Sequence, residues 1–255
     1  MKIYLAIGRC DKSRVSLFKK EGVQRVLVSY ASFQGEASLS LPFSDVMLDS
    51  GAYSVATDRE KVSVRAYGLW LSLYLTTHPQ IKEYVNLDDL SDPIITRKNQ
   101  EFLESLGLHP IPVYHYGEPT EILDALCSRY RYVGLGGIAV GTMSSPNLQK
   151  FWEFVYERYS SNIFHIFGVG TMAPFFTYQP YSLDCTSWST AARFGDIMCY
   201  KDGLPCIGAF GIREGITTFF TTQEMFSNNI RALLSFEKCE WVGKVRTEKV
   251  QKRLL

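Results

Sequence analysis

The sequence lacks the features that define several large classes of protein. It has no run of about 18 apolar residues, so we expect no membrane span. The net charge is only +1, so no global field draws in a polyanion, and a nucleic-acid partner would have to be held by a local basic face. There is no low-complexity linker and no repeat of fixed period, which makes one domain the default for 255 residues.

The six cysteines follow no recognisable metal or disulfide pattern. No two of them form a C-x-x-C pair, and no histidine stands at zinc-finger spacing. Scattered thiols are typical of a reduced compartment, so we expect a cytoplasmic protein with no bound metal and no cofactor. The apolar run at the N-terminus is short and is followed by Arg9 and Asp11, which predicts a first strand rather than a signal peptide.

Short apolar runs rich in Val, Ile, Tyr and Phe alternate with longer segments of helical periodicity. Several runs are apolar at successive positions, as expected of parallel strands buried on both faces. The predicted strands are Ile3–Ile7, Arg25–Tyr30, Asp45–Asp49, Tyr84–Asp88, Pro110–His115, Tyr132–Gly136, Ile163–Gly168 and Tyr181–Asp184. The predicted helices include Arg59–Thr77, Glu118–Arg129, Asn147–Tyr159 and Thr222–Phe236, whereas Ser187–Gly215 is expected to be irregular.

Eight such strand and helix units predict an α/β fold, a (β/α)8 TIM barrel that forms a single domain over residues 1–255. A closing helix and a basic tail are expected from about residue 220. The alternative is a doubly wound open sheet, because periodicity alone does not show whether a sheet closes.

Polar residues and glycines fall at the carboxyl ends of the predicted strands, where barrel enzymes carry their catalytic groups. Taken singly, an aspartate at a strand end is as often a helix cap or a turn residue, and a glycine is more often a turn device. His165 lies within an apolar run and is expected to be structural. The strand-end residues are Asp49, Asp88, Asp89, His115, Gly136, Gly137, Gly168 and Asp184.

Paired carboxylates suit glycosyl chemistry. One attacks the anomeric carbon, and the other protonates the leaving group and later deprotonates the incoming group. When the incoming group is a base rather than water, the result is base exchange with retained configuration.

Four segments together resemble the tRNA-guanine transglycosylases. Leu135-Gly136-Gly137-Ile138-Ala139-Val140-Gly141 is similar to the glycine-rich motif of that family, and Phe167-Gly168-Val169-Gly170 to its Met-Gly-Val-Gly. Asp49-Ser50-Gly51-Ala52-Tyr53 resembles its Asp-Ser-Gly-Gly-Phe/Tyr segment, and Asp184-Cys185 its Asp-Cys pair. The segments occur in the family's order, over more than half of the chain.

The resemblance implies a role for each matching residue. Asp184 would be the nucleophile, and Asp49 the general acid/base. Asp88 would read the purine edge. The groups implied to contact the base are Gly136, Gly137, Gly168, His115 and Tyr53.

Two departures from the family matter. The family's Val-Gln-Gly, whose glutamine helps to hold the base, is replaced here by Tyr114-His115-Tyr116-Gly117. The family's zinc ligands, Cys-x-Cys-x-x-Cys followed by His, are missing. The chain is most similar to compact phage-type relatives that exchange guanine in DNA for a 7-deazaguanine, which implies a host-cytoplasm location if it is encoded by a virus.

Several functions stay open at this stage. The first is 7-deazaguanine exchange in DNA, and the second is the same exchange in tRNA. The others are a hydrolase that removes a base and an inactive barrel that only binds nucleic acid. Oligomeric state is not predicted. The expected phosphate contacts are Arg9, Lys12, Arg14 and Arg193, although most basic residues are simply solvated.

Overall fold

The computed structural model describes residues 1–8, 11–32, 42–52, 62–138, 145–170, 175, 178–201, 204–210 and 221–238. The strands are β1 (Lys2–Ala6), β2 (Arg25–Ser29), β3 (Asp45–Asp49), β4 (Ile81–Tyr84), β5 (Val113–His115), β6 (Tyr132–Gly136), β7 (Ile163–Ile166), β8 (Ser182–Cys185), β9 (Ile197–Lys201) and β10 (Leu204–Phe210). The helices are α1 (Lys12–Lys20), α3 (Val64–Thr77), α4 (Pro93–Ser105), α5 (Thr120–Arg129), α6 (Ser145–Arg158), α7 (Ser187–Arg193) and α8 (Thr222–Lys238), with a short 3-10 turn at Tyr30–Ser32.

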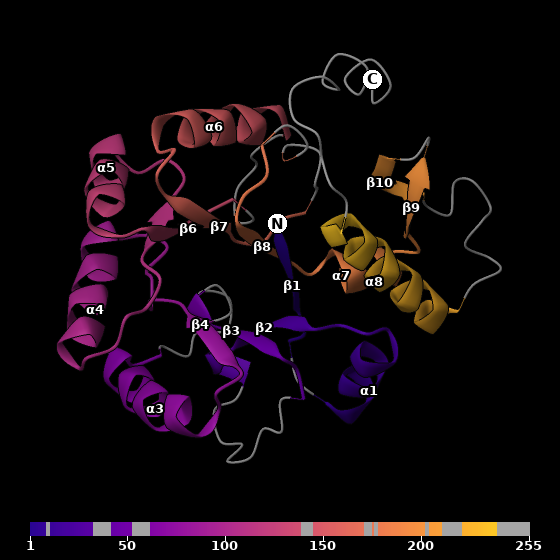
Figure 1. The fold of residues 1–255 in the computed structure, drawn as a ribbon, viewed down its shortest axis with the longest axis horizontal. Helices are drawn as coiled ribbons and strands as arrows, with labels where there is room; N and C mark the ends of the chain where they lie inside the picture. The colour runs from indigo at the N-terminus through magenta and orange to yellow at the C-terminus, as the bar shows by residue number, and fades with distance from the viewer. Residues whose placement is uncertain are drawn as a thin grey trace.

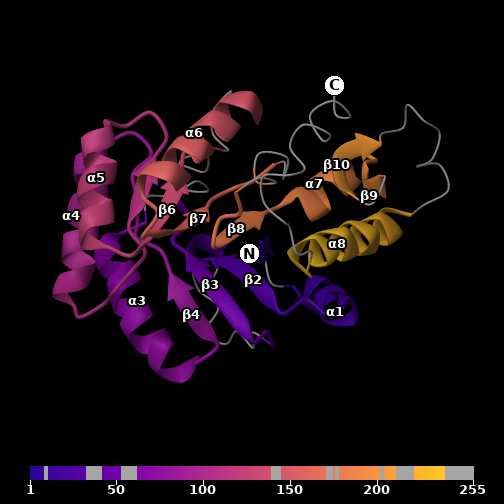
Figure 2. The ribbon, with the colours of Figure 1, turned by 45° about the horizontal axis from the view of Figure 1, so that its top comes forward.

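Strands β1 to β8 form one eight-stranded, all-parallel, curled sheet in the order β4-β3-β2-β1-β8-β7-β6-β5. Helices lie around its outside, as the two views show (Figure 1, Figure 2). The curl brings the two edges together, because Val85 after β4 and Ile111 before β5 form an isolated parallel bridge. The predicted α/β alternation and the parallel sheet are confirmed, and the architecture is TIM-barrel-like.

The side chains separate into an outer and an inner layer because successive residues of a strand point to opposite faces. Along β1, Ile3 and Leu5 belong to the large apolar cluster under the helices, whereas Tyr4 belongs to a smaller second cluster. That smaller cluster fills the inside of the curl and contains Tyr4, Leu27, Met47, Val85, Ile111 and Val113. In the same alternation, Asp49 follows Met47 by two positions, and His115 follows Val113 by two. Both are therefore inward positions at the carboxyl end of the sheet.

The helices begin and end where local chemistry directs. Asp92 caps α4 by accepting a 2.7 Å hydrogen bond from the Ile94 amide, with Pro93 in the first turn. At α8, Thr221 and Glu224 form the reciprocal capping box. No helix within the described part of the chain is both long and apolar enough to cross a membrane.

The predicted fourth strand, Tyr84–Asp88, is wrong in its placement. Strand β4 covers Ile81–Tyr84, so Asp88 lies four residues beyond the strand rather than at its last position. Beyond Tyr84 the backbone still contacts both neighbours, because the Val85 amide donates to the Leu48 carbonyl of β3 at 2.9 Å. The Asn86 amide donates to the Ile111 carbonyl at 3.0 Å, and the Asn86 side chain donates to the Thr96 carbonyl at 2.8 Å.

The expected irregular region, Ser187–Gly215, is also wrong in part. It contains α7 and an antiparallel hairpin of β9 and β10. The hairpin is tied to the closing helix by Asn229 of α8, which accepts from the Met198 amide at 2.7 Å. The sequence did carry a hairpin signal, since Asp202-Gly203 stands between two apolar runs. The closing helix itself is confirmed at Thr222–Lys238.

Candidate active site

Three aspartates from separate strands converge at the carboxyl end of the curled sheet. Asp49 is the last residue of β3, Asp184 lies in β8, and Asp88 follows β4. They are close enough that the charges of Asp88 and Asp184 both act on Asp49. The structure therefore brings together the acids that the sequence placed at strand ends.

Asp49 is held in an unusual electrostatic environment. Burial first, and then the negative charges of Asp88 and Asp184, together raise the pKa of Asp49 to about 7. The Gly51 amide donates to Asp49 Oδ2 at 3.0 Å, which fixes the carboxyl group. Gly51 has a φ of 85°, and a Cβ there would lie 2.5 Å from the Ala31 Cβ, so the turn requires glycine.

Asp184 is almost fully buried, with 6% of its surface exposed, and its Oδ1 atom is anchored. The Gly168 amide donates to that oxygen at 2.9 Å. His165 Nε2 lies 3.3 Å from the same oxygen. The other oxygen, Oδ2, has no hydrogen-bond partner among the residues that the structure describes. The carboxylate is therefore oriented through Oδ1, and no described residue donates to Oδ2.

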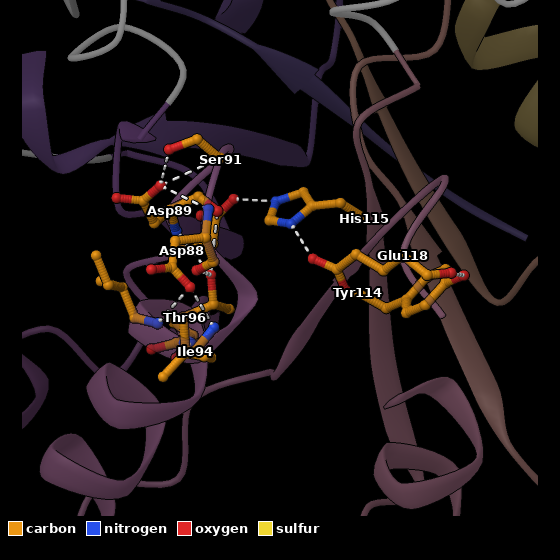
Figure 3. Close-up of polar contacts among 11 residues, drawn as sticks. Asp88, Asp89, Ser91, Ile94, Thr96, Tyr114, His115 and Glu118 are labelled. Atoms are coloured by element: carbon orange, nitrogen blue, oxygen red, sulfur yellow. Dashed lines mark hydrogen bonds and ion pairs between the residues drawn. The ribbon is translucent and has the colours of Figure 1, made fainter. Parts of the chain in front are cut away.

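His115 is a buried side chain that lies between two carboxylates (Figure 3). Its Nε2 is 2.7 Å from Asp88 Oδ2, and its Nδ1 is 3.0 Å from Glu118 Oε1. Burial alone would lower the pKa of His115, but the hydrogen bonds to Asp88 and Glu118 outweigh it and raise the pKa to about 9. His115 is thus an imidazolium at neutral pH that donates to both acids. Glu118 was not predicted, although its spacing of three residues from His115 allows contact across a turn.

The predicted glycines have more than one role. A Cβ on Gly136 would lie 2.9 Å from the His115 ring, so this glycine makes room for His115. Gly137, with a φ of 76°, turns the chain as the strand ends. Gly168 contributes directly to the site, because its amide binds Asp184.

Asp89 is a turn residue. Its Oδ1 accepts from the amides of Ser91 and Asp92 and from the Ser91 hydroxyl, and it so closes the turn before α4 (Figure 3). Asp88 and Asp89 therefore differ. Asp88 binds His115, whereas Asp89 accepts hydrogen bonds from backbone amides.

The predicted phosphate contacts that the structure describes lie in two helices, α1 and α7. Lys12 is exposed in the first turn of α1, which begins beyond the carboxyl end of β1. Arg14 donates to the Ile7 carbonyl at 3.0 Å and pairs with Asp11, so it has a structural role. Arg193 is exposed in the last turn of α7. Arg9, Tyr53 and the basic tail lie outside the described residues.

A cleft of about 290 Å³ lies between the end of β7 and α7, and none of Asp49, Asp88 and Asp184 lines it. Its lining includes Gly168, Gly170, Thr186 and Thr190. Because the Gly168 amide also binds Asp184, the cleft adjoins the anchored carboxylate. It offers hydroxyl groups and open backbone to a ligand that enters beside Asp184.

Within the described ranges, no group of three or more His, Cys, Asp or Glu side chains is placed to hold a metal ion. In comparisons with known proteins, no protein-family model matches the chain and no curated protein matches it.

Proposed function

We propose that the chain is a nucleic-acid guanine transglycosylase. It exchanges guanine for a 7-deazaguanine base in DNA through a covalent glycosyl–Asp184 intermediate, on a single-domain (β/α)8 barrel. The observation that carries the proposal is the contrast between two neighbouring acids. Burial raises the pKa of Asp49 to about 7, so this residue can both give and take a proton near neutrality. Asp184 has one oxygen anchored by the Gly168 amide, and its other oxygen has no partner in the part of the chain that the structure describes.

The first half-reaction releases guanine. Asp184 attacks C1′ of the sugar and forms a C1′–O bond while the C1′–N9 bond breaks. The electron pair of that bond moves onto guanine, which takes a proton from the Asp49 carboxyl group. The products are a glycosyl ester on Asp184, free guanine and an Asp49 carboxylate.

The second half-reaction runs the same steps in reverse with a different base. The Asp49 carboxylate takes the N9 proton of the 7-deazaguanine as N9 attacks C1′. The C1′–O bond breaks, its electron pair returns to Asp184, and Asp49 is again protonated. Two displacements at C1′ leave the configuration of the sugar unchanged.

Asp88 is the best-placed group to recognise a guanine-like base. Its Oδ2 is occupied by His115 at 2.7 Å, which fixes the plane of the carboxylate. The second oxygen can then accept from the N–H groups on the purine edge. Since both nitrogens of His115 already donate to acids, we assign His115 to holding Asp88 rather than to the glutamine's role of touching the base.

The choice of DNA rests on sequence rather than on the site. The zinc ligands that the tRNA-acting family carries after the nucleophile have no counterpart here. A guanine stacked in a duplex would have to be flipped out, or a single strand used. Exchange on tRNA stays the alternative, along with an inactive barrel that only binds nucleic acid.

The test is incorporation of labelled guanine into single-stranded DNA, duplex DNA and tRNA, run side by side with wild-type protein and Asp184→Asn. Label in DNA that depends on Asp184 supports the proposal. Label only in tRNA keeps the chemistry and rejects DNA. Release of guanine with no uptake of label indicates a hydrolase, and no release at all rejects catalysis.

A further inference from the structure

A chain of polar side chains runs through the inside of the curled sheet and ends at Asp184. His165 Nε2 lies 3.3 Å from Asp184 Oδ1, and His165 Nδ1 lies 2.8 Å from Ser182 Oγ. Ser182 Oγ is in turn 2.5 Å from the Tyr132 hydroxyl. The contacts follow from register, because His165 of β7 is the partner of Ser182 in β8. Asp184 then lies two positions further along β8, on the same face.

The surroundings of this chain are aromatic. The edge of the Tyr4 ring faces His165 with centroids 6.0 Å apart, and Phe167 packs against His165 at 4.4 Å. His165 and Ser182 are both fully buried. A buried polar group that lacks a partner is strongly destabilising, so the contacts in the chain fix one another's direction.

The direction can be worked out from Asp184. An ionised carboxylate only accepts hydrogen bonds, so His165 Nε2 must carry a proton and donate to Oδ1. In a neutral imidazole, Nδ1 is then an acceptor, and the Ser182 hydroxyl must donate to it. Ser182 Oγ is left to accept from Tyr132. Burial raises the pKa of Tyr132, so its hydroxyl keeps the proton that this requires.

We propose that His165 is a positioning residue for the nucleophile. Ser182 and Tyr132 lock it in the Nε2–H tautomer. Together with the Gly168 amide, it holds Oδ1 of Asp184, so that Oδ2 is the oxygen that attacks C1′. This inference rests on the proposed function for the attack, but the tautomer and the orientation of the carboxylate follow from the hydrogen-bond chain with Asp184 as an acceptor.

The tautomer has a direct readout that needs no substrate. Nitrogen-15 spectra of the full chain at neutral pH should show His165 protonated at Nε2 and unprotonated at Nδ1. Assignment comes from the signal that is lost in His165→Gln. In Ser182→Ala the Nδ1 resonance should shift, because its donor is gone. A signal from the Nδ1–H tautomer, or an unchanged Nδ1 resonance in Ser182→Ala, overturns the inference.

Kinetics test the positioning role. His165→Leu removes the donor, and misplacement of the carboxylate should lower kcat for base exchange by about 10²-fold, with KM for DNA unchanged. His165→Gln puts an amide donor near the position of Nε2 and should recover part of that loss. Tyr132→Phe should lower kcat by less, because Tyr132 reaches Asp184 only through Ser182 and His165.

Tyr181→Phe is the matched control. Its ring packs edge-on against Tyr132 at 5.3 Å, but it is not a member of the chain. It should leave kcat unchanged. Equal kcat losses in Tyr132→Phe and Tyr181→Phe, or recovery in Leu but not in Gln at position 165, overturn the positioning role.

The two proposals fail in different ways. If wild-type protein exchanges no base but shows the Nε2–H tautomer, the proposed function fails and the geometry stands. If wild-type protein is active and all His165 variants match it in kcat, the positioning role fails and the function stands.

Discussion

His115 Nε2 lies 2.7 Å from Asp88 Oδ2, and this contact fixes the position of Asp88 at the carboxyl end of the curled sheet. It joins the end of β5 to the loop after β4, at the seam where the curled sheet is linked by the single Val85–Ile111 bridge. Because Glu118 binds the other nitrogen, the imidazolium is balanced by charge on both sides. Asp88 is therefore tied to the seam where β4 and β5 are joined by an isolated bridge.

His115→Gln should destabilise the fold in a pH-dependent way. The pKa of His115 is raised from 6.5 to about 9, so the stabilisation from the protonated ring is complete below pH 6.5 and is lost as the pH rises through about 9. We expect the variant to lose about 2 kcal/mol of unfolding free energy at low pH, and less at high pH. Urea unfolding between these limits measures the difference. His109→Gln, at an exposed position, is the control and should show no such trend.

Asp49→Asn should make the protein more stable at alkaline pH and nearly inactive. The pKa of Asp49 is raised from 3.8 to about 7, by burial first and then by the charges of Asp88 and Asp184, so the contribution of this group to stability is fully present below pH 3.8 and is lost as the pH rises through about 7. Each pKa unit corresponds to roughly 1.4 kcal/mol, so the amide should gain a few kcal/mol over wild type above neutrality. Loss of acid/base help should lower the exchange rate by about 10²–10⁴-fold. Equal stability of the two proteins at all pH values would show that Asp49 is not buried as a charge.

Asp88→Asn should shift the titration of Asp49. The charge of Asp88 is the second cause of the raised pKa of Asp49, after burial. Removing it should lower that pKa and move the alkaline limb of kcat/KM to lower pH. Carbon-13 titration of the Asp49 carboxyl follows this without substrate. Asp89→Asn is the matched control, because Asp89 closes a turn through its Oδ1. A shift of the same size in both variants contradicts the arrangement.

The strands that could be located from sequence are those whose terminal residues differ sharply from the apolar residues of their interiors. β3 and β6 were predicted with the observed bounds, because each is an apolar run that stops at a polar residue or a glycine. β4 was misplaced because two of its four residues are charged, with Lys82 exposed and Glu83 partly buried, so the strand contains no apolar run. The apolar run that follows β4 is buried at the seam instead, where Val85 bridges to Ile111.

The chemistry of the site was only partly predictable. Asp49 and Asp184 could be placed at one end of the sheet, because parallel strands share an orientation. The pairing of His115 with Asp88 spans 27 residues and depends on how two loops meet, which periodicity does not specify. His165 was expected to be structural because it sits within an apolar run. Its contact with Asp184 depends on register between β7 and β8.

Lys12→Glu should weaken binding of single-stranded DNA and reduce its dependence on salt. Lys12 is exposed in the first turn of α1, near the carboxyl end of β1, where a phosphate would approach the acids. Loss of one phosphate contact should reduce the slope of log K against log salt by about 0.7. Lys19 is exposed near the other end of the same helix. Lys19→Glu changes the net charge by the same amount as Lys12→Glu and should leave the slope unaltered. An equal effect of both substitutions would assign binding to net charge alone.

The most direct test of the central claim is the mass of the covalent intermediate. Wild-type protein is mixed with a short DNA strand that carries one guanine, quenched in acid and digested, and the peptides are analysed by mass spectrometry. We expect an adduct with the mass of the strand without guanine, attached to Asp184. Asp184→Asn should give none, and added free guanine should discharge the wild-type adduct. Base exchange by wild-type protein with no adduct, or with an adduct on any residue other than Asp184, would contradict that claim.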